Sequence, residues 1–167
     1  MSGPTKNFLC ISTYFKGQDF LKQCKAEGNC VFLLTKKSLE HEPWPWDAID
    51  EVFYIDKWNI EDVKKGLAFK FREITFHRFV ALDDFDVEKV AVLREHFRMP
   101  GMGSTTARYF RDKLAMRMKA KEEGINVPSF TDLFTNEAIN QYADSVSPPW
   151  LIKPRMEASA TGIKKIH

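Results

Sequence analysis

The chain has 167 residues and a mass of 19.4 kDa, which suits one ordinary domain or two very small ones. Hydrophobic residues make up 44% and charged residues 29%, the balance of a globular protein with a real core, so extensive disorder is excluded. The net charge of +2 is too small to predict binding of nucleic acid or of an anionic membrane surface, and no apolar run approaches the roughly 20 residues of a membrane span.

Short apolar runs alternate with amphipathic stretches in the first half of the chain. Each run is closed by polar residues, which is typical of a buried strand. The four predicted strands are residues 8–11, 30–34, 52–55 and 79–82. Because near-continuous apolar strands separated by helices favour a parallel sheet covered on both faces, residues 1–98 are predicted to form a Rossmann-like α/β domain.

Helices are predicted between and after these strands. The first spans residues 17–27 and ends before Gly28, a residue type that is common just after a helix. Its apolar side is formed by Phe20, Leu21 and Cys24. Asn59 and Asp86 are suited to cap the next two helices, because a short polar side chain can accept free backbone N–H groups. The proline-rich stretch 36–47 is predicted to be irregular.

The second half has a different character. A long helix is predicted from Ser104 or Thr105 to about Glu123, with Gly124 as its end. Its apolar face is predicted to consist of Ala107, Phe110, Leu114 and Met118. Residues 99–167 are therefore predicted to form a second domain.

The end of the chain is predicted to form a hairpin. Thr135 is suited to cap a helix that ends before Ser147, and strands are predicted at 150–153 and 162–166. The returning strand has no further neighbour in the sequence, and natural domains avoid open sheet edges. We therefore expect the chain to be an N-terminal fragment, and its unpaired hairpin favours self-association into a homo-oligomer.

The hairpin contains the first candidate anion-binding residues. Lys153 follows an apolar strand, which holds the residue at a fixed point with its ammonium free to meet an anion. The loop beyond it consists of small residues, whose backbone N–H groups can approach an anion closely. These residues are Ala158, Ser159, Ala160, Thr161 and Gly162. The alternative interpretation is a polar turn with a solvated lysine.

A second candidate lies on the long basic helix. Lys113 precedes Leu114 and so lies about 100° around the helix from it, at the border of the predicted apolar face. Arg108 and Lys119 point nearly the opposite way. Most basic residues of this helix are expected to form a solvated face, and Lys113 is the candidate for contact with an anion.

Taken in order along the chain, these features resemble the start of an ATP-grasp domain. The matching motifs are Arg111-Asp112-Lys113, Gly124-Ile125-Asn126-Val127-Pro128, Leu151-Ile152-Lys153-Pro154 and the small-residue loop that ends at Gly162. The two lysines are 40 positions apart, which is similar to the family's spacing. The stretch 81–95 also resembles the end of the Rossmann-like domain that precedes ATP-grasp domains, so the resemblance covers nearly the whole chain.

The resemblance implies roles for these residues. Lys113 and Lys153 would hold the α- and β-phosphates of ATP, and the loop from Glu157 to Gly162 would fold over the β- and γ-phosphates. ATP-grasp ligases use the γ-phosphate to convert a carboxylate into an acyl-phosphate, which an amine or thiol then attacks. The implied protein is an ATP-dependent carboxylate–amine or carboxylate–thiol ligase, with ATP, Mg²⁺ and a small carboxylate as its ligands.

Parts of the family's pattern are missing from this sequence. The chain ends before the adenine-binding strand and before the acidic and Asn residues that ligate Mg²⁺ in the family. Those metal ligands are expected to lie beyond this chain, and no residue of the chain is predicted to be catalytic or to bind a metal. The fragment by itself is therefore expected to be inactive.

Two alternatives stay open. The first is a non-catalytic α/β module that binds a small molecule or a protein partner at the strand tips near Tyr14 and Asp83. The second is a receiver-like domain, which fits poorly because the acidic pair Asp83-Asp84 follows the fourth apolar run and not the first. The ligase hypothesis requires Lys113 and Lys153 to converge on one phosphate-sized space, whereas the binding module leaves them unrelated.

The cysteines bear on the cellular compartment. Cys10, Cys24 and Cys30 are odd in number and form no CxxC pair. The N-terminus carries no basic stretch followed by an apolar one, so no signal peptide is predicted. We expect a reduced, cytoplasmic protein without structural zinc.

Overall fold

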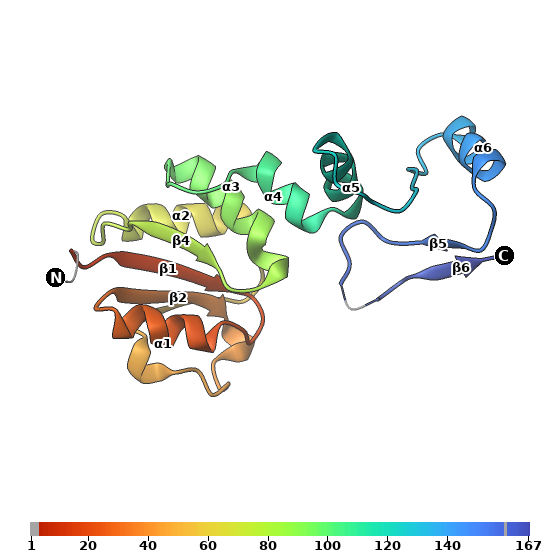
Figure 1. Cartoon of the computed structure of the whole chain (residues 1–167). Helices are drawn as coiled ribbons and strands as arrows, with labels where there is room; N and C mark the ends of the chain where they lie inside the picture. Colours follow the sequence, from red (N-terminus) through yellow and green to blue (C-terminus); the bar gives the residue numbers. More distant parts are fainter. Residues whose placement is uncertain (1–3, 159) are drawn as a thin grey trace. The chain divides into compact units, whose positions relative to one another are not determined.

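The computed structural model describes residues 4–158 and 160–167, and the chain divides into two compact units. The first unit comprises residues 1–107 and the second residues 108–167 (Figure 1). The division falls within helix α4 (Ser104–Arg111). The domain boundary after residue 98 stays a prediction.

A four-stranded parallel sheet forms the centre of the first unit. Its strands are β1 (Asn7–Ser12), β2 (Cys30–Lys36), β3 (Glu51–Ile55) and β4 (Arg78–Ala81). They lie in the order β3-β2-β1-β4, and the register places Leu9 of β1 between Phe32 of β2 and Phe79 of β4. The four predicted strands and the α/β fold class are confirmed.

Helices cover both faces of this sheet, as predicted (Figure 1). They are α1 (Gln18–Ala26), α2 (Ile60–Lys70) and α3 (Val87–Phe97). Leu21 of α1 packs with Cys10 and Leu33 on one face. Leu67 of α2 and Val90 of α3 belong to a larger cluster on the other face. Burial of these apolar side chains is the main source of stability for such a unit.

Most local signals of the first unit are confirmed. Asn59 caps α2, because its side chain accepts the backbone N–H groups of Glu61 at 3.0 Å and Asp62 at 3.3 Å. Gly28 follows α1 with a φ of 80°, a conformation that glycine adopts at little cost. Phe20, predicted to lie on the apolar side of α1, is 41% exposed instead.

The connection between β2 and β3 is largely irregular, as predicted. It contains only two short 3₁₀ turns, η1 (Lys37–Leu39) and η2 (Trp46–Ala48). The Trp44 side chain is buried in it, and its indole N–H donates to the carbonyl of Leu39 at 2.9 Å.

The second unit consists of two helices and a hairpin. These elements are α5 (Lys113–Glu122), α6 (Asn136–Ser145), β5 (Trp150–Ile152) and β6 (Lys164–Ile166). Thr135 caps α6 as predicted, with its hydroxyl accepting the N–H of Ala138 at 3.1 Å. β5 and β6 pair in antiparallel fashion, which confirms the predicted hairpin. In the described part of residues 108–167, no large apolar side chain is fully buried.

The predicted single helix from residue 104 to 123 is wrong. α4 ends at Arg111, and α5 begins at Lys113. Asp112 lies between them with an extended backbone, and its carboxylate accepts the N–H groups of Leu114 at 3.0 Å and Ala115 at 3.4 Å. A capping aspartate starts a new helix, so the periodic pattern continues across a break that periodicity alone does not detect.

The apolar face predicted for that long helix needs the same correction. Ala107 is fully buried, but Phe110 is 59% and Met118 is 50% exposed. A helical repeat shows which residues share a face, and it does not show that another element covers the face.

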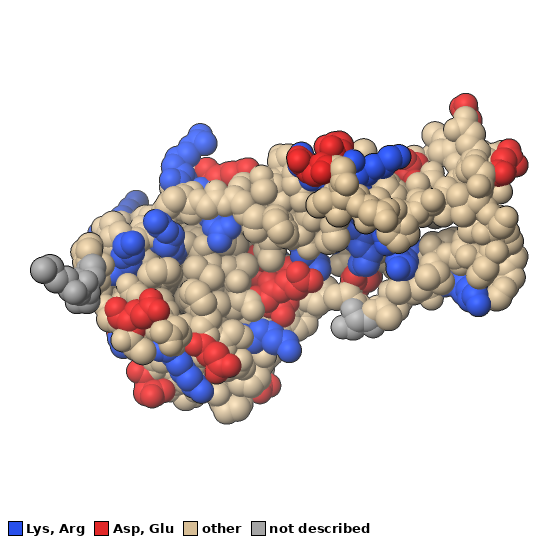
Figure 2. Space-filling view, in the orientation of Figure 1, with Lys and Arg blue, Asp and Glu red and all other residues tan. Residues whose placement is uncertain are grey.

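The surface carries charges of both signs (Figure 2), and two of the cysteines are buried. No helix among the described residues is long and apolar enough to cross a membrane. Figure 2 shows Lys and Arg side chains interspersed with Asp and Glu on the face in view, in line with the small net charge. Burial raises the pKa of the thiols of Cys10 and Cys24, so both are poorly reactive.

Candidate functional site

The start of α5 contacts the chain segment that follows β5. The backbone N–H of Lys113 donates to the carbonyl oxygen of Arg155 at 3.0 Å. The Nζ of Lys113 also donates to the carbonyl oxygen of Glu157, the first residue of the predicted phosphate loop. Two sequence-predicted features, Lys113 and this loop, are therefore in direct contact although they are 44 residues apart.

An ion pair fixes this junction. Arg155 Nε donates to Asp112 Oδ1 at 2.9 Å, and its Nη2 pairs with the second carboxylate oxygen. Arg155 holds the pKa of Asp112 below its usual range, and Asp112 raises the pKa of Arg155. Arg111 adds a further contact, from Nη2 to the carbonyl of Met156 at 2.7 Å. Both members of the pair stay charged at neutral pH.

Lys153 lies on the same segment, just after β5. The strand ends at Ile152 and the chain bends at residues 155–156, but exposure alternates along the segment: Leu151, Lys153, Arg155 and Glu157 are exposed and the residues between them are partly buried. Lys153 and Arg155 therefore share the exposed side of the segment. Two residues span at most about 7 Å. Lys153 thus lies a short distance from the ion pair, on its side of the chain.

The hairpin register adds another cation to this side. Lys165 of β6 pairs with Leu151 of β5, and side chains directly opposite each other in an antiparallel pair lie on one face. Lys164 pairs with Ile152 and belongs to the other face. Lys165 and Lys153 are therefore on a common face of the hairpin.

Positive charge exceeds negative charge where these elements meet. The cations are Arg111, Lys113, Lys153 and Arg155, and the anions are Asp112 and Glu157. Cations whose positions are fixed by backbone contacts and an ion pair can neutralise a polyphosphate without much reorganisation. The arrangement suits an anion with several charged oxygens.

The predicted phosphate loop has a defined turn. The N–H of Thr161 donates to the carbonyl of Ala158 at 3.1 Å, and Ala160 and Gly162 have φ values of 61° and 72°. A Cβ at Gly162 would come within 2.8 Å of Pro154 Cγ, so a larger residue would strain the turn. Ser159 lies outside the described residues.

Arg111, Asp112 and Arg155 were not among the predicted site residues. Arg155 is 43 residues from its partner, and no local pattern signals such a contact. The cap at Asp112 could have been predicted from the sequence, because an aspartate directly before the first residue of a helix is a common N-cap. The roles of Lys113, Lys153 and the 157–162 loop in binding nucleotide stay predictions.

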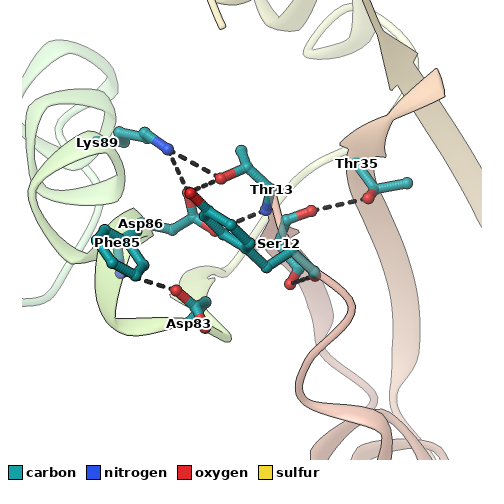
Figure 3. A network of polar contacts seen from close by, with 8 residues as sticks. Ser12, Thr13, Thr35, Asp83, Phe85, Asp86 and Lys89 are labelled. Carbon is teal, nitrogen blue, oxygen red and sulfur yellow. Dashed lines mark hydrogen bonds and ion pairs between the residues drawn. The ribbon is translucent and has the colours of Figure 1, made fainter. Parts of the chain in front are cut away.

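The strand tips of the first unit form a second polar cluster (Figure 3). Asp86 is fully buried, and its carboxylate accepts the N–H of Thr13 at 2.6 Å and the Thr13 hydroxyl at 2.7 Å. Lys89 donates to Asp86 at 2.7 Å and to the Thr13 hydroxyl at 2.9 Å. Asp86 stands at the start of α3 but gives it no side-chain cap, which corrects the predicted role of this residue.

These contacts close the loop after β1 on itself. The Ser12 hydroxyl donates to the carbonyl of Tyr14 at 2.5 Å, and the Thr35 hydroxyl donates to the carbonyl of Ser12 at 2.7 Å. Asp83 accepts the N–H of Phe85 at 2.9 Å and so caps a short 3₁₀ turn that precedes α3. Polar groups at this edge of the sheet are thus engaged with one another.

A shallow recess of about 420 Å³ lies elsewhere in the second unit. Its lining includes Lys121, Ile125, Phe130, Tyr142 and Val146. Neither Lys113 nor Lys153 lines it. The recess is therefore separate from the cations at the start of α5 and after β5.

The described residues do not offer a metal site of their own. No group of three or more His, Cys, Asp or Glu side chains among residues 4–158 and 160–167 is placed to hold a metal ion. Asp112 is engaged by Arg155 and by two backbone N–H groups. The donor set fits phosphate and does not fit Mg²⁺.

Comparisons with known proteins point to one group of enzymes. The chain is 29% identical over 119 residues to the L-arginine-specific L-amino acid ligase of Bacillus subtilis, covering 71% of this chain and 29% of that protein. Its fold matches the L-amino acid ligase of Bacillus licheniformis with a TM-score of 0.73 and 18% identity, over 97% of this chain and 38% of that one. No family model matches the sequence.

A third relative was solved with a bound nucleotide. It is the N5-carboxyaminoimidazole synthetase of Staphylococcus aureus in complex with ADP, with a TM-score of 0.73 and 15% identity over 96% of this chain and 41% of that one. The chain thus spans less than half the length of each of these relatives. The predicted resemblance is confirmed: the chain has the α/β fold of the N-terminal portion of ATP-grasp ligases.

Proposed function

We propose that this chain supplies the N-terminal part of an ATP-dependent carboxylate–amine or carboxylate–thiol ligase, and that Lys113 and Lys153 bind the phosphates of ATP. The observation that carries the proposal is the contact between the start of α5 and the 155–157 segment. It brings Lys113 to the predicted phosphate loop and leaves Lys153 on the adjacent exposed side.

The chemistry of this junction supports phosphate binding. Lys113 donates to the carbonyl of Glu157, and a phosphate oxygen is a stronger acceptor that would take the place of this carbonyl. Release of Glu157 would free the 157–162 loop to fold over the terminal phosphates. The residues of this chain would then bind and orient the nucleotide by charge neutralisation, which is most of what phosphoryl transfer requires of a protein.

When bound, ATP would supply the γ-phosphate that activates a carboxylate as an acyl-phosphate for attack by an amine or a thiol. Mg²⁺, the small carboxylate substrate and the reacting groups are assigned to the parent ligase rather than to the described residues of this chain. The chain alone would hold nucleotide weakly and would not catalyse the reaction. The cytoplasm is the proposed compartment.

The test is thermal unfolding of the 167-residue chain with and without millimolar Mg-ATP. A ligand that binds only the folded form stabilises it by RT ln(1 + [L]/Kd), which is about 1.4 kcal/mol at ten times Kd. We expect a rise in Tm for the wild type and a loss of that rise in Lys113→Met and Lys153→Met. Lys164→Met removes the same charge from the other face of the hairpin and should keep the rise.

The outcomes separate the two functional hypotheses. A rise in Tm that both lysine variants retain would contradict the assignment of the phosphate site. No rise in the wild type would contradict nucleotide binding by this chain. The binding module at the strand tips receives little support, because the polar groups near Tyr14 and Asp83 are engaged with one another.

A further inference from the structure

We propose that the Asp112–Arg155 ion pair sets the separation of Lys113 and Lys153, so that both ammonium groups face one polyphosphate chain. The inference rests on the proposed function, in which these lysines bind ATP. Asp112 and Arg155 are positioning residues here and need not touch the nucleotide.

The ion pair joins the two chain segments that carry Lys113 and Lys153. Asp112 directly precedes Lys113, and Arg155 follows Lys153 by two residues on the same exposed side of its segment. A contact between Asp112 and Arg155 therefore brings together the two backbone positions from which the lysines project. The backbone bond from Lys113 to Arg155 at 3.0 Å reinforces the same alignment.

The Asp112–Arg155 pair has two contacts and therefore a defined geometry. Both carboxylate oxygens of Asp112 are engaged by the guanidinium, and a planar fork of this kind fixes orientation as well as distance. Asp112 is 4% exposed, so water screens the pair little on that side. The same carboxylate caps α5 through Leu114 and Ala115, which ties the ion pair rigidly to the helix that carries Lys113.

The ion pair also counteracts electrostatic repulsion between the two lysines. Two ammonium groups directed at one site repel each other until an anion arrives. The second unit has no fully buried large apolar side chain among its described residues that would hold the segments together against this repulsion. An ion pair between the two segments supplies that restraint without engaging the ammonium group of either lysine.

Three substitutions separate positioning from helix capping. Asp112→Asn keeps a side-chain oxygen that can accept the two helix N–H groups but removes the charge that binds Arg155. Arg155→Gln removes the partner and leaves the cap intact, and its side chain is 49% exposed, so the variant is expected to fold. Arg155→Lys keeps the charge but lacks the fork. Lys164→Gln is the control for loss of one positive charge on the opposite face of the hairpin.

The experiment has two arms on the full chain. In the first, a short amine-reactive cross-linker is applied without nucleotide, and the yield of the Lys113–Lys153 product is measured by mass spectrometry. We expect this yield to fall severalfold in Asp112→Asn and Arg155→Gln, to fall less in Arg155→Lys, and to stay unchanged in Lys164→Gln. In the second arm, the Kd for Mg-ATP is measured by calorimetry and should rise about tenfold in the first two variants, which corresponds to about 1.4 kcal/mol.

The two arms distinguish failure of the inference from failure of the proposed function. An unchanged cross-linking yield in both Asp112→Asn and Arg155→Gln would overturn the positioning role, whatever the nucleotide affinity. A reduced yield in a chain whose wild type does not bind Mg-ATP would retain the positioning role and reject the nucleotide. Circular dichroism of each variant confirms that the helices are intact, so that a changed yield reports spacing and not unfolding.

Discussion

In the first unit Leu9, Phe79 and Val90 are essentially fully buried, whereas in the second unit Ile125, Phe134 and Leu151 are more than half exposed. The first unit closes a parallel sheet between helices, and its side-chain positions follow from apolar packing. The second unit is held by caps, a two-stranded hairpin and the Asp112–Arg155 pair. Polar contacts can thus hold segments that are distant in the sequence together in a unit with little apolar core.

Truncation of one aromatic side chain in each unit tests this difference most directly. Phe79 is 1% exposed and contacts the rings of Phe71, Phe76 and Phe97, so Phe79→Ala should cost about 3–5 kcal/mol in the free energy of unfolding. Phe134 is 68% exposed, and Phe134→Ala should change stability by less than about 0.5 kcal/mol. Urea denaturation followed by circular dichroism measures both. A large loss for Phe134→Ala would mean that the second unit has an apolar core after all.

The next largest effect concerns the buried acid of the first unit. Asp86→Ala leaves the N–H and hydroxyl of Thr13 without their acceptor and removes the charged partner of Lys89, so we expect a loss of about 3 kcal/mol in the free energy of unfolding. Asp83→Ala is the matched control, because Asp83 accepts only the N–H of Phe85 among its described contacts and its loss should cost about 1 kcal/mol. The same urea titration compares them, and equal losses would show that the buried network contributes nothing beyond a cap.

The sequence was most informative where structure is local. The strands of the first unit, the caps Asn59 and Thr135, and the hairpin follow from apolar runs and capping residues that lie within a few positions of one another. The binding roles of Lys113 and Lys153 follow from their place in an ordered set of motifs and stay predictions. None of these predictions depends on a contact between distant segments.

What the sequence did not indicate depends on partners far along the chain. Asp86 has the sequence features of a helix cap, but its carboxylate is taken by Thr13, 73 residues away. The break at Asp112 leaves the helical repeat of apolar residues intact, so the repeat predicts one helix where there are two. Arg155 has no local signal at all, because its role is defined by a partner 43 residues earlier.

The Asp112–Arg155 pair makes the stability of the second unit depend on pH. Arg155 holds the pKa of Asp112 below its usual range, so the pair stabilises the folded unit fully above the ordinary aspartate pKa of about 3.9. This contribution is lost as the pH falls through the lowered pKa. We expect an NMR titration of the Asp112 carboxyl group to show a midpoint below the ordinary value in the wild type and a higher one in Arg155→Gln. The same midpoint in both proteins would mean that the ion pair does not form in solution.

A small loss of stability is expected from two matched helix caps. Asn59→Ala and Thr135→Ala each remove a side chain that accepts N–H groups at the start of a helix, and such a loss costs about 1 kcal/mol. In the first unit, Val63 and Leu67 anchor α2 in the core. Loss of the Asn59 cap should therefore lower the free energy of unfolding of the whole unit.

In the second unit α6 has no buried side chain, so Thr135→Ala should fray the start of that helix and leave the rest of the chain unchanged. Amide hydrogen exchange measures the difference: protection should fall across β1, β2 and β4 in Asn59→Ala, and only near residues 136–139 in Thr135→Ala. The opposite pattern would require the second unit to fold as cooperatively as the first, which its exposed apolar side chains argue against.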